Sequence, residues 1–318
     1  MSIFNNLKVA FKDKTNFELN RSLLIFSIIS NPFISKSLIT LTKLAINLKI
    51  PIGFLIKNTI FKQFCGGTNI KNTSITIDKL WLSKIGSILD YSVEGKEKEV
   101  DFEKVKNETI NNIIKASKSK KIPFAVFKPT GLTKFNLLEK INSNLNLNKQ
   151  EIIEKQKFIN RIDKICKTSY DYKIPVFIDA EESWIQEGID KIVLSMMEKY
   201  NKNEVYIYNT LQMYRIDRLD YLNEIISKAK KERFLLGIKL VRGAYHQQEI
   251  DRAIKLKYEV PVFKTKNKSD ESFNKSLKIC CDNINHISIC AGTHNENSSQ
   301  LLIDLMKKNN IKKSDPRI

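Results

Sequence analysis

The sequence predicts an α/β fold, a (βα)8 TIM-type barrel that is incomplete, with about six βα units, and is preceded by N-terminal helices. Two observations predict it. From Gly86 onward, short apolar runs rich in Ile, Val, Phe or Tyr alternate with amphipathic helical segments, which is the pattern of βαβ units and a parallel sheet. Polar residues also end successive apolar runs, and the carboxyl ends of parallel strands meet at one rim, where barrels carry their chemistry.

The apolar runs are the expected strands, and they cover residues 87–93, 123–130, 175–181, 204–212, 236–243 and 286–295. The segments between them place apolar residues on one helical face, as at Phe102, Val105 and Ile113. No GxGxxG or GxxxxGK[ST] loop follows any of these strands, which disfavours the common open-sheet nucleotide folds. The polar residues that end the second to sixth strands are Lys128, Asp179, Gln212, Arg242 and then Thr293, His294 and Asn295.

Composition narrows the function class. The chain has 318 residues, a hydrophobic fraction of 42% and a formal charge of +19. Its lysines are spread along the whole sequence without a basic face or tail, so we expect no nucleic-acid partner. Its five cysteines form no CxxC pair and suit a reducing compartment, and with three histidines we expect no metal site.

The first 75 residues predict a separate helical region, and residues 76–318 predict the barrel. We expect no secretory signal, because the first residues lack an apolar core. The apolar stretch 22–50 is interrupted by Pro32, Lys36 and Lys43, so it favours two or three amphipathic helices over a membrane span. These helices pack on the domain or touch a membrane surface. The expected location is the cytoplasm, with a peripheral contact to the inner membrane as the open alternative.

Seven sequence blocks, in order along the chain, resemble those of the proline dehydrogenases. The most specific is KLVRGAY at 239–245. The others are DYSVE at 90–94, FKPTG at 127–131, IDAEE at 178–182, NTLQMY at 209–214, PVFKTK at 261–266 with Ser269 and Asp270, and GTHN at 292–295. The resemblance runs from Phe64 to the last residue. It implies oxidation of L-proline to Δ1-pyrroline-5-carboxylate with reduction of FAD, followed by electron transfer to a membrane quinone.

The resemblance implies roles for the substrate residues. Lys128 pairs with the substrate carboxylate, and an ammonium at the end of an apolar strand does need an anionic partner. Asp179 is a candidate partner of Lys128 when substrate is absent. Leu240 and Tyr245 are expected to line the pocket of the proline ring. Lys128, Asp179 and Tyr245 form the expected catalytic set.

The resemblance also implies the cofactor residues. Gln212 resembles the amide that meets the pyrimidine edge of the flavin, since an amide offers both a donor and an acceptor. Lys239 and Arg242 would bring positive charge near a ring that gains negative charge on reduction. Gly243, with Ala244 beside it, would allow a close approach of the backbone to the flavin. The residues that resemble the ribityl and pyrophosphate contacts are Lys266, Thr293, His294 and Asn295.

The sequence departs from the family at its end. The family continues past Asp315 into two further strands and a last helix, which carries an Arg pair that clamps the substrate carboxylate. We therefore expect either a fragment of a longer protein or a truncated gene product, with two exposed sheet edges. The alternatives are a truncated, non-catalytic remnant of such an enzyme, and a flavin barrel acting on a folate, against which the KLVRGAY and FKPTG blocks argue.

Overall fold

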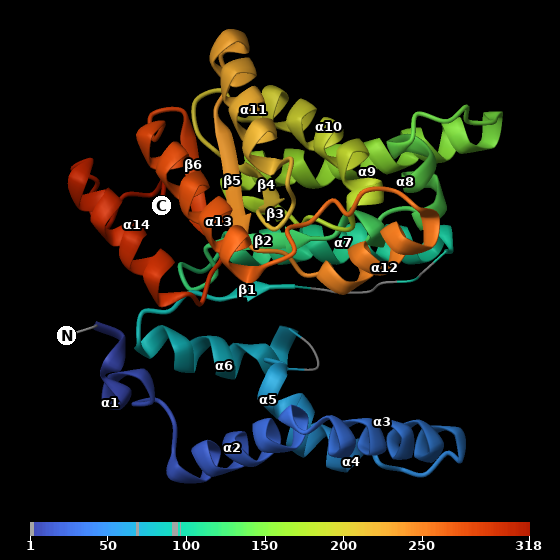
Figure 1. The fold of residues 1–318 in the computed structure, drawn as a ribbon, viewed down its shortest axis with the longest axis vertical. Helices are drawn as coiled ribbons and strands as arrows, with labels where there is room; N and C mark the ends of the chain where they lie inside the picture. The colour runs from blue at the N-terminus through green and yellow to red at the C-terminus, as the bar shows by residue number, and fades with distance from the viewer. Residues whose placement is uncertain (1–2, 68–69, 91–94, 96) are drawn as a thin grey trace. The chain divides into compact units, whose positions relative to one another are not determined.

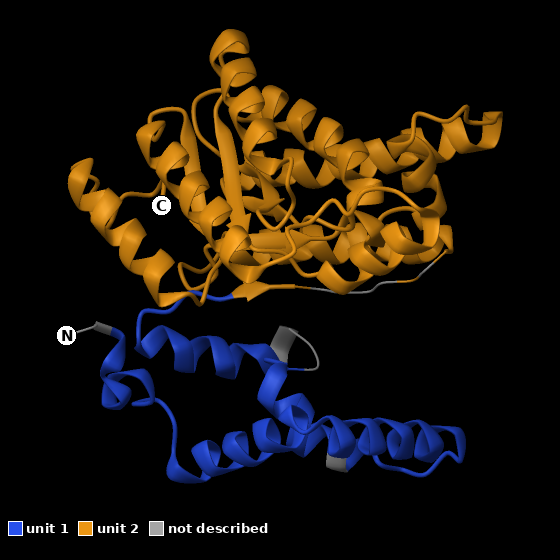
Figure 2. Ribbon diagram, viewed as in Figure 1, with its two compact units in different colours: residues 1–87 blue, residues 88–318 orange. Residues whose placement is uncertain are grey.

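The computed structural model describes residues 3–67, 70–90, 95 and 97–318. The chain divides into two compact units, residues 1–87 and residues 88–318 (Figure 2). The first unit is helical and the second is an α/β unit (Figure 1). Each unit has its own pattern of burial, and each is described by itself.

The first unit is built from short and medium helices that follow one another closely. Thr15 and Glu18 form a reciprocal capping box at the start of α2, and Asn31 caps α3, which begins at Pro32. The elements are η1 (Ile3–Asn5), α1 (Leu7–Ala10), α2 (Asn16–Ser30), α3 (Pro32–Asn47), α4 (Gly53–Ile56), the π-helical turn η2 (Lys57–Phe61), α5 (Lys62–Phe64) and α6 (Ile70–Leu82).

The apolar residues of this unit are mostly exposed, and Ile25 and Ile77 are its buried hydrophobic residues among those described. Within the described ranges, no single helix is long and apolar enough to cross a membrane. The pair α2 and α3 passes the test of length and composition only when taken together, and it is bent by 95° at the break between the two helices. Pro32 stands at that break, as the sequence analysis expected.

The second unit is a six-stranded parallel sheet in the order β1-β2-β3-β4-β5-β6. The strands are β1 (Ile88–Leu89), β2 (Phe124–Phe127), β3 (Val176–Ile178), β4 (Ile207–Gln212), β5 (Leu236–Val241) and β6 (Ile287–Ala291). The connecting elements are α7 (Glu99–Ala116), η3 (Pro129–Gly131), α8 (Phe135–Asn142), α9 (Lys149–Tyr172), α10 (Ser183–Tyr200), α11 (Arg218–Glu232), α12 (His246–Leu256), α13 (Lys266–Asp282) and α14 (Glu296–Lys308).

All six expected strands are confirmed, each at its expected place and each shorter than its apolar run. Residues 91–94 of the first run lie outside the described residues. Strands β1 and β6 end the sheet, and the outer side of β6 has a hydrogen bond from the Ile289 amide to the Arg317 carbonyl, 2.6 Å long.

Alternate residues along each strand face opposite sides of the sheet. One side packs against the helices and forms the main core, to which β3 contributes Val176 and Ile178 and β5 contributes Leu240. The other side carries a small aromatic cluster. Its rings are Phe124, Phe177 and Tyr208, and the first two are stacked with centroids 4.4 Å apart. The polar residues at the strand ends continue this second side.

We predict that the core between α9 and the sheet dominates the stability of the second unit. Ile162 and Ile153 lie on the same helix, but Ile162 is fully buried and Ile153 is half exposed. Ile162→Ala should lower the free energy of unfolding by about 2–5 kcal/mol, because it removes buried methyl groups and leaves a cavity. Ile153→Ala, the matched control, should change it by less than about 1 kcal/mol. Urea unfolding of both variants measures this, and equal losses would contradict the assignment of the core.

Candidate active site at the carboxyl ends of the strands

A cavity of about 640 Å³ opens at the carboxyl ends of the strands of the second unit. Its walls come from β2 to β6 and from the loops that follow them. The lining residues are Lys128, Asp179, Ala180, Thr210, Gln212, Lys239, Val241, Arg242, Gly243, Ala244, Tyr245, Lys266, Gly292, Thr293, His294 and Asn295. Polar groups that are far apart in the sequence therefore share one space.

The floor of the cavity is a row of polar side chains set by the strand register. Thr210 of β4 is paired in register with Lys239 of β5, and Asp179 directly follows β3. The Lys239 Nζ lies 2.6 Å from the Asp179 Oδ1, and the Thr210 hydroxyl lies 3.4 Å from the same oxygen. Lys239 also stands 5.1 Å from the centroid of the Phe177 ring. A cation and an anion are thus held together on the floor, with an aromatic face beneath the cation.

Gln212 ends β4 one layer above this floor. Its Nε2 donates to the Glu181 carbonyl at 2.7 Å, and its Oε1 accepts from the Ala244 amide at 3.0 Å. A side-chain amide has two N–H groups and two lone pairs, so one donor and one acceptor of Gln212 remain for a ligand. The protein therefore fixes the orientation of this amide before any ligand binds.

Glu181 lies behind the cavity wall and is buried. Its carboxylate accepts two hydrogen bonds from Thr130, from the amide at 2.8 Å and from the hydroxyl at 2.6 Å. Burial raises the pKa of Glu181 to about 7, and the bonds from Thr130 and the charge of Lys128 offset part of that effect. The Glu181 amide donates to Gln186 Oε1 at 2.7 Å, which ties the residue to α10.

Arg242 directly follows β5, and each nitrogen of its guanidinium group donates a hydrogen bond. Its Nε donates to Asp270, its Nη1 donates to the Thr293 hydroxyl at 2.7 Å, and its Nη2 donates to the Ser298 hydroxyl at 3.0 Å. Lys266 donates to the other oxygen of Asp270 at 2.7 Å. Burial alone would raise the pKa of Asp270, but these two cations lower it below its usual range. The cluster gathers two positive charges around one carboxylate, which suits an anionic ligand.

Gly243 has a φ of +140°, a conformation that favours glycine. A Cβ built there would lie 2.4 Å from the Tyr214 ring. The role expected for this glycine was to allow a close approach of the backbone to a flavin. The structure supplies a different reason, since the backbone conformation and the packing of Tyr214 already require glycine.

Two further lining residues, Tyr245 and Asn295, lie at helix starts. Tyr245 is the residue before α12. Asn295 caps α14, where its Oδ1 accepts from the Ser298 amide at 3.0 Å, and its own amide donates to the Thr293 hydroxyl at 3.0 Å. His294, which lies between Thr293 and Asn295, is exposed. The start of a helix presents unpaired amide groups and favours negative charge.

The structure brings together the expected site residues with one exception. Leu240 is wrong as a lining residue, because it is fully buried in the core between the sheet and the helices. The reason is the alternation along β5, which turns Lys239 and Val241 towards the cavity and Leu240 away from it. Thr210, Val241, Ala180 and Gly292 were missed as lining residues. Side chains two residues apart on a strand face the same side, so Val241 follows from Lys239 and Thr210 follows from Gln212. Both could therefore have been identified from the sequence alone.

A parallel sheet whose six strands lie in chain order, with helices packed on one side and a polar cavity at the carboxyl ends of the strands, is the arrangement found in TIM-type barrel proteins. Comparison with known proteins narrows this class. The sequence profile of the family described as proline dehydrogenase matches residues 74–318, and the chain belongs to this family.

Among curated relatives, the chain is 32% identical to proline dehydrogenase 1, mitochondrial, of Dictyostelium discoideum, over 97% of this chain and 62% of that protein. It is 31% identical to the carbapenem antibiotics biosynthesis protein CarD of Pectobacterium carotovorum, over 79% of this chain and 65% of that protein. The chain thus spans less than two thirds of the length of these relatives.

Among solved structures, the fold is similar to that of proline utilization A (PutA) from Bdellovibrio bacteriovorus. The TM-score is 0.72 at 18% identity, over 83% of this chain and 29% of that one. PutA from Bradyrhizobium japonicum gives a TM-score of 0.61 at 17% identity, over 76% of this chain and 24% of that one. These similarities confirm the predicted barrel fold.

We predict that Glu181 makes stability depend on pH. Its pKa is about 7 in the folded protein and 4.5 ordinarily, so the folded state binds the proton more tightly than the unfolded state between these values. Stability from this group is full below pH 4.5 and is lost as pH rises through 7. The free energy of unfolding of the wild type, minus that of Glu181→Gln, should fall by about 2–3 kcal/mol between pH 5 and pH 8. Urea unfolding across this range measures it, and a flat difference would contradict the raised pKa.

Proposed function

We propose that the protein oxidises L-proline to Δ1-pyrroline-5-carboxylate, with FAD as its cofactor and a membrane quinone as the final electron acceptor. One observation carries the proposal. Blocks of sequence that resemble the proline dehydrogenases, spread from 127 to 295, contribute their polar residues to one cavity. The membership of the chain in this family supports the same substrate.

The donor set of the cavity fits FAD. Arg242 and Lys266 supply two cations, and the start of α14 supplies amide groups, which together suit a pyrophosphate. The free donor and acceptor of Gln212 suit the edge of the flavin ring. FAD, when bound, supplies the two-electron acceptor of the reaction. The other proposed cofactor contacts are Lys239, Gly243, Ala244, Thr293, His294 and Asn295.

The protein side of the chemistry is binding and orientation. The Lys128 ammonium, at the end of β2, pairs with the carboxylate of proline, and Tyr245 covers the apolar face of its ring. We assign the Asp179 carboxylate, which lines the cavity and is held by Lys239, to the secondary amine of proline. A negative charge there stabilises the cation that the amine becomes as it gives up electrons.

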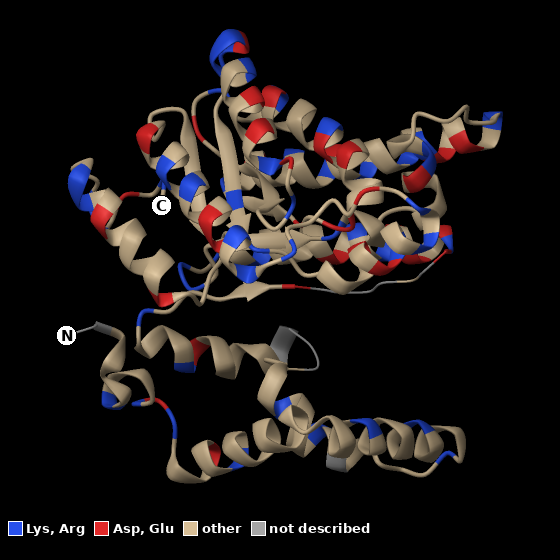
Figure 3. Ribbon diagram, viewed as in Figure 1, with Lys and Arg blue, Asp and Glu red and all other residues tan. Residues whose placement is uncertain are grey.

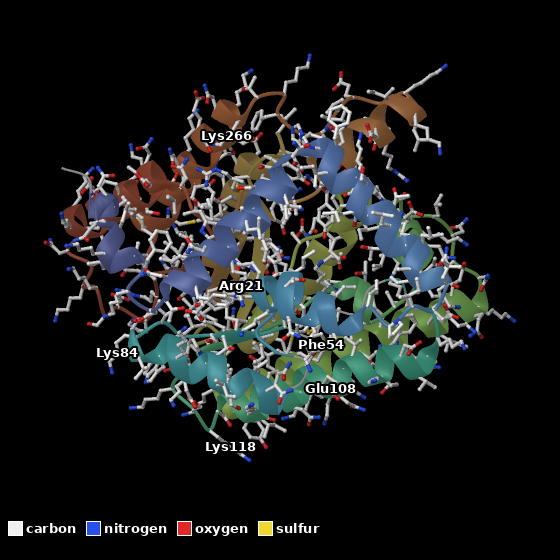
Figure 4. All side chains as sticks on the ribbon, turned by 90° about the horizontal axis from the view of Figure 1, so that it is seen from below. Arg21, Phe54, Lys84, Glu108, Lys118 and Lys266 are labelled. Carbon is white, nitrogen blue, oxygen red and sulfur yellow. The ribbon has the colours of Figure 1, made fainter. Side chains whose placement is uncertain are left out.

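The first unit is proposed as the contact with the membrane that holds the quinone. Between Glu18 and Asp78 the sequence has seven Lys or Arg residues and no Asp or Glu. The helices of this unit expose large apolar side chains, among them Phe33 at 86% and Phe54 at 81%; Figure 4 labels Phe54. Apolar groups flanked by cations suit an anionic lipid surface. The cytoplasmic location stays a prediction, and several relatives are named as mitochondrial.

The first experiment on this function is a flavin spectrum of the purified protein. We expect bound flavin whose absorbance is bleached by L-proline. Arg242→Ala should lower the flavin retained after desalting by roughly tenfold or more, since it removes a charge-assisted contact to a phosphate. Lys231→Ala, an exposed lysine on α11, is the control and should retain flavin as the wild type does. Equal retention in both variants would contradict the cofactor site, and no bound flavin in the wild type would favour the non-catalytic remnant.

The membrane contact is tested by flotation with vesicles of phosphatidylcholine and phosphatidylglycerol in equal parts. The double variant Phe33→Ser, Phe54→Ser should bind at least tenfold less, because burying two aromatic rings contributes roughly 3 kcal/mol or more. Val100→Ser, which changes an apolar residue 78% exposed on α7 of the second unit, is the control. Binding should also weaken at high salt. Undiminished binding of the double variant would overturn this part of the proposal.

A further inference from the structure

Glu181 lies behind the cavity and joins the ends of several strands. Its carboxylate accepts both hydrogen bonds that Thr130 can donate, from the amide and from the hydroxyl. Thr130 stands in η3, the turn that starts directly after Lys128. The Glu181 side chain therefore fixes the turn from which the Lys128 side chain reaches the cavity.

The backbone of Glu181 is fixed as well. Its carbonyl accepts from Gln212, and its amide donates to Gln186. Gln186 in turn donates to Asp190 at 2.8 Å, and Asp190 forms a buried ion pair with Arg218 at 2.6 Å. This chain of bonds ties Glu181 to α10 and α11, so its carboxylate is a rigid anchor for the turn.

A buried carboxylate is an unfavourable group with which to fix a turn, because its burial destabilises the folded state. Glu181 is 3% exposed, and burying the charge of a carboxyl group destabilises the fold. Two charged groups adjoin it, Lys128 and the neighbouring Glu182, and they act on it in opposite directions. A carboxylate offers two acceptors at once to one residue, which matches the two donors of Thr130. The destabilisation caused by burying Glu181 is explained if the function requires the 128–131 turn to be held in one position.

We propose that Glu181 is a positioning residue for Lys128: by clamping Thr130, it holds the 128–131 turn so that the Lys128 ammonium stays at the face of the cavity. The inference rests on the proposed function for its consequence, since Lys128 is assigned there to the carboxylate of proline. The clamp itself is a matter of geometry and holds whatever the substrate.

The first test needs no activity. Competitive labelling of lysines with acetic anhydride, followed by peptide mass spectrometry, measures the reactivity of Lys128 relative to the exposed Lys118 of the same protein. We expect Glu181→Ala to change this ratio by roughly threefold or more, because a freed turn alters the exposure and surroundings of the ammonium. Glu181→Gln should restore the wild-type ratio, since its amide accepts from the Thr130 amide and donates to the Thr130 hydroxyl. An unchanged ratio in Glu181→Ala overturns the proposal.

The second test measures the consequence with L-proline. Glu181→Ala should raise KM by roughly 10- to 100-fold with flavin content unchanged and kcat within about threefold, and Glu181→Gln should recover most of the KM. Glu187→Ala, which removes an exposed glutamate on α10, should behave as the wild type. A loss of flavin and folding stability in both Glu181 variants, with no recovery by Gln, would show a structural role only and overturn the proposal. Absence of any bleaching by proline in the wild type would refute the proposed function, while the labelling ratio would still decide the clamp.

Discussion

The alternation of side chains along parallel strands is the constraint on which the second unit depends. Every second residue along each strand packs against the helices and forms the main core, as Val176, Ile178 and Leu240 do. The residues between them face the other side of the sheet. They form the aromatic cluster and, towards the carboxyl ends of the strands, the polar groups of the cavity. Because both sets lie on the same six short strands, the packing that stabilises the sheet also positions the site. A shift of register by one residue would exchange core and site.

The cations of the site are held by anions of the same chain. The protein carries a large positive charge, and a partly buried ammonium or guanidinium without a partner would be costly. Lys239 is paired with Asp179, while Arg242 and Lys266 share Asp270. These pairs keep the cations in place before a ligand arrives, so less conformational entropy is lost on binding. Two donors of Arg242 bond to hydroxyl groups, which an anionic ligand can displace at smaller cost than a carboxylate.

The two units bury their apolar residues to different extents. In the second unit the large apolar side chains of the strands and of the inner helix faces are buried. In the first unit, two described apolar residues are buried and many large ones are exposed. The absence of acidic residues between Glu18 and Asp78 adds a second difference, since the second unit mixes both signs of charge (Figure 3). The second unit therefore has a closed apolar core, whereas the first unit presents a cationic and apolar surface.

The sequence by itself determined the order of strands and helices, the parallel sheet, the family and most of the lining of the cavity. It could do so because periodicity is a local property and because the strand-end residues of a parallel sheet must share one rim. Leu240 was expected in the cavity because it belongs to the KLVRGAY block, whereas the alternation of side chains along β5 turns it into the core.

Only the tertiary structure decided which charges pair and what each special residue does. Asp179 is joined to Lys239 across the intervening β4, Gly243 is required by the Tyr214 ring, and the Gln212 amide is oriented by Glu181 and Ala244. Glu181 itself was part of a recognised block but had no role there, because its contact with Thr130 joins residues 51 positions apart. Distances between side chains from different strands follow from how the sheet twists and how the helices pack, and no local pattern in the sequence records them.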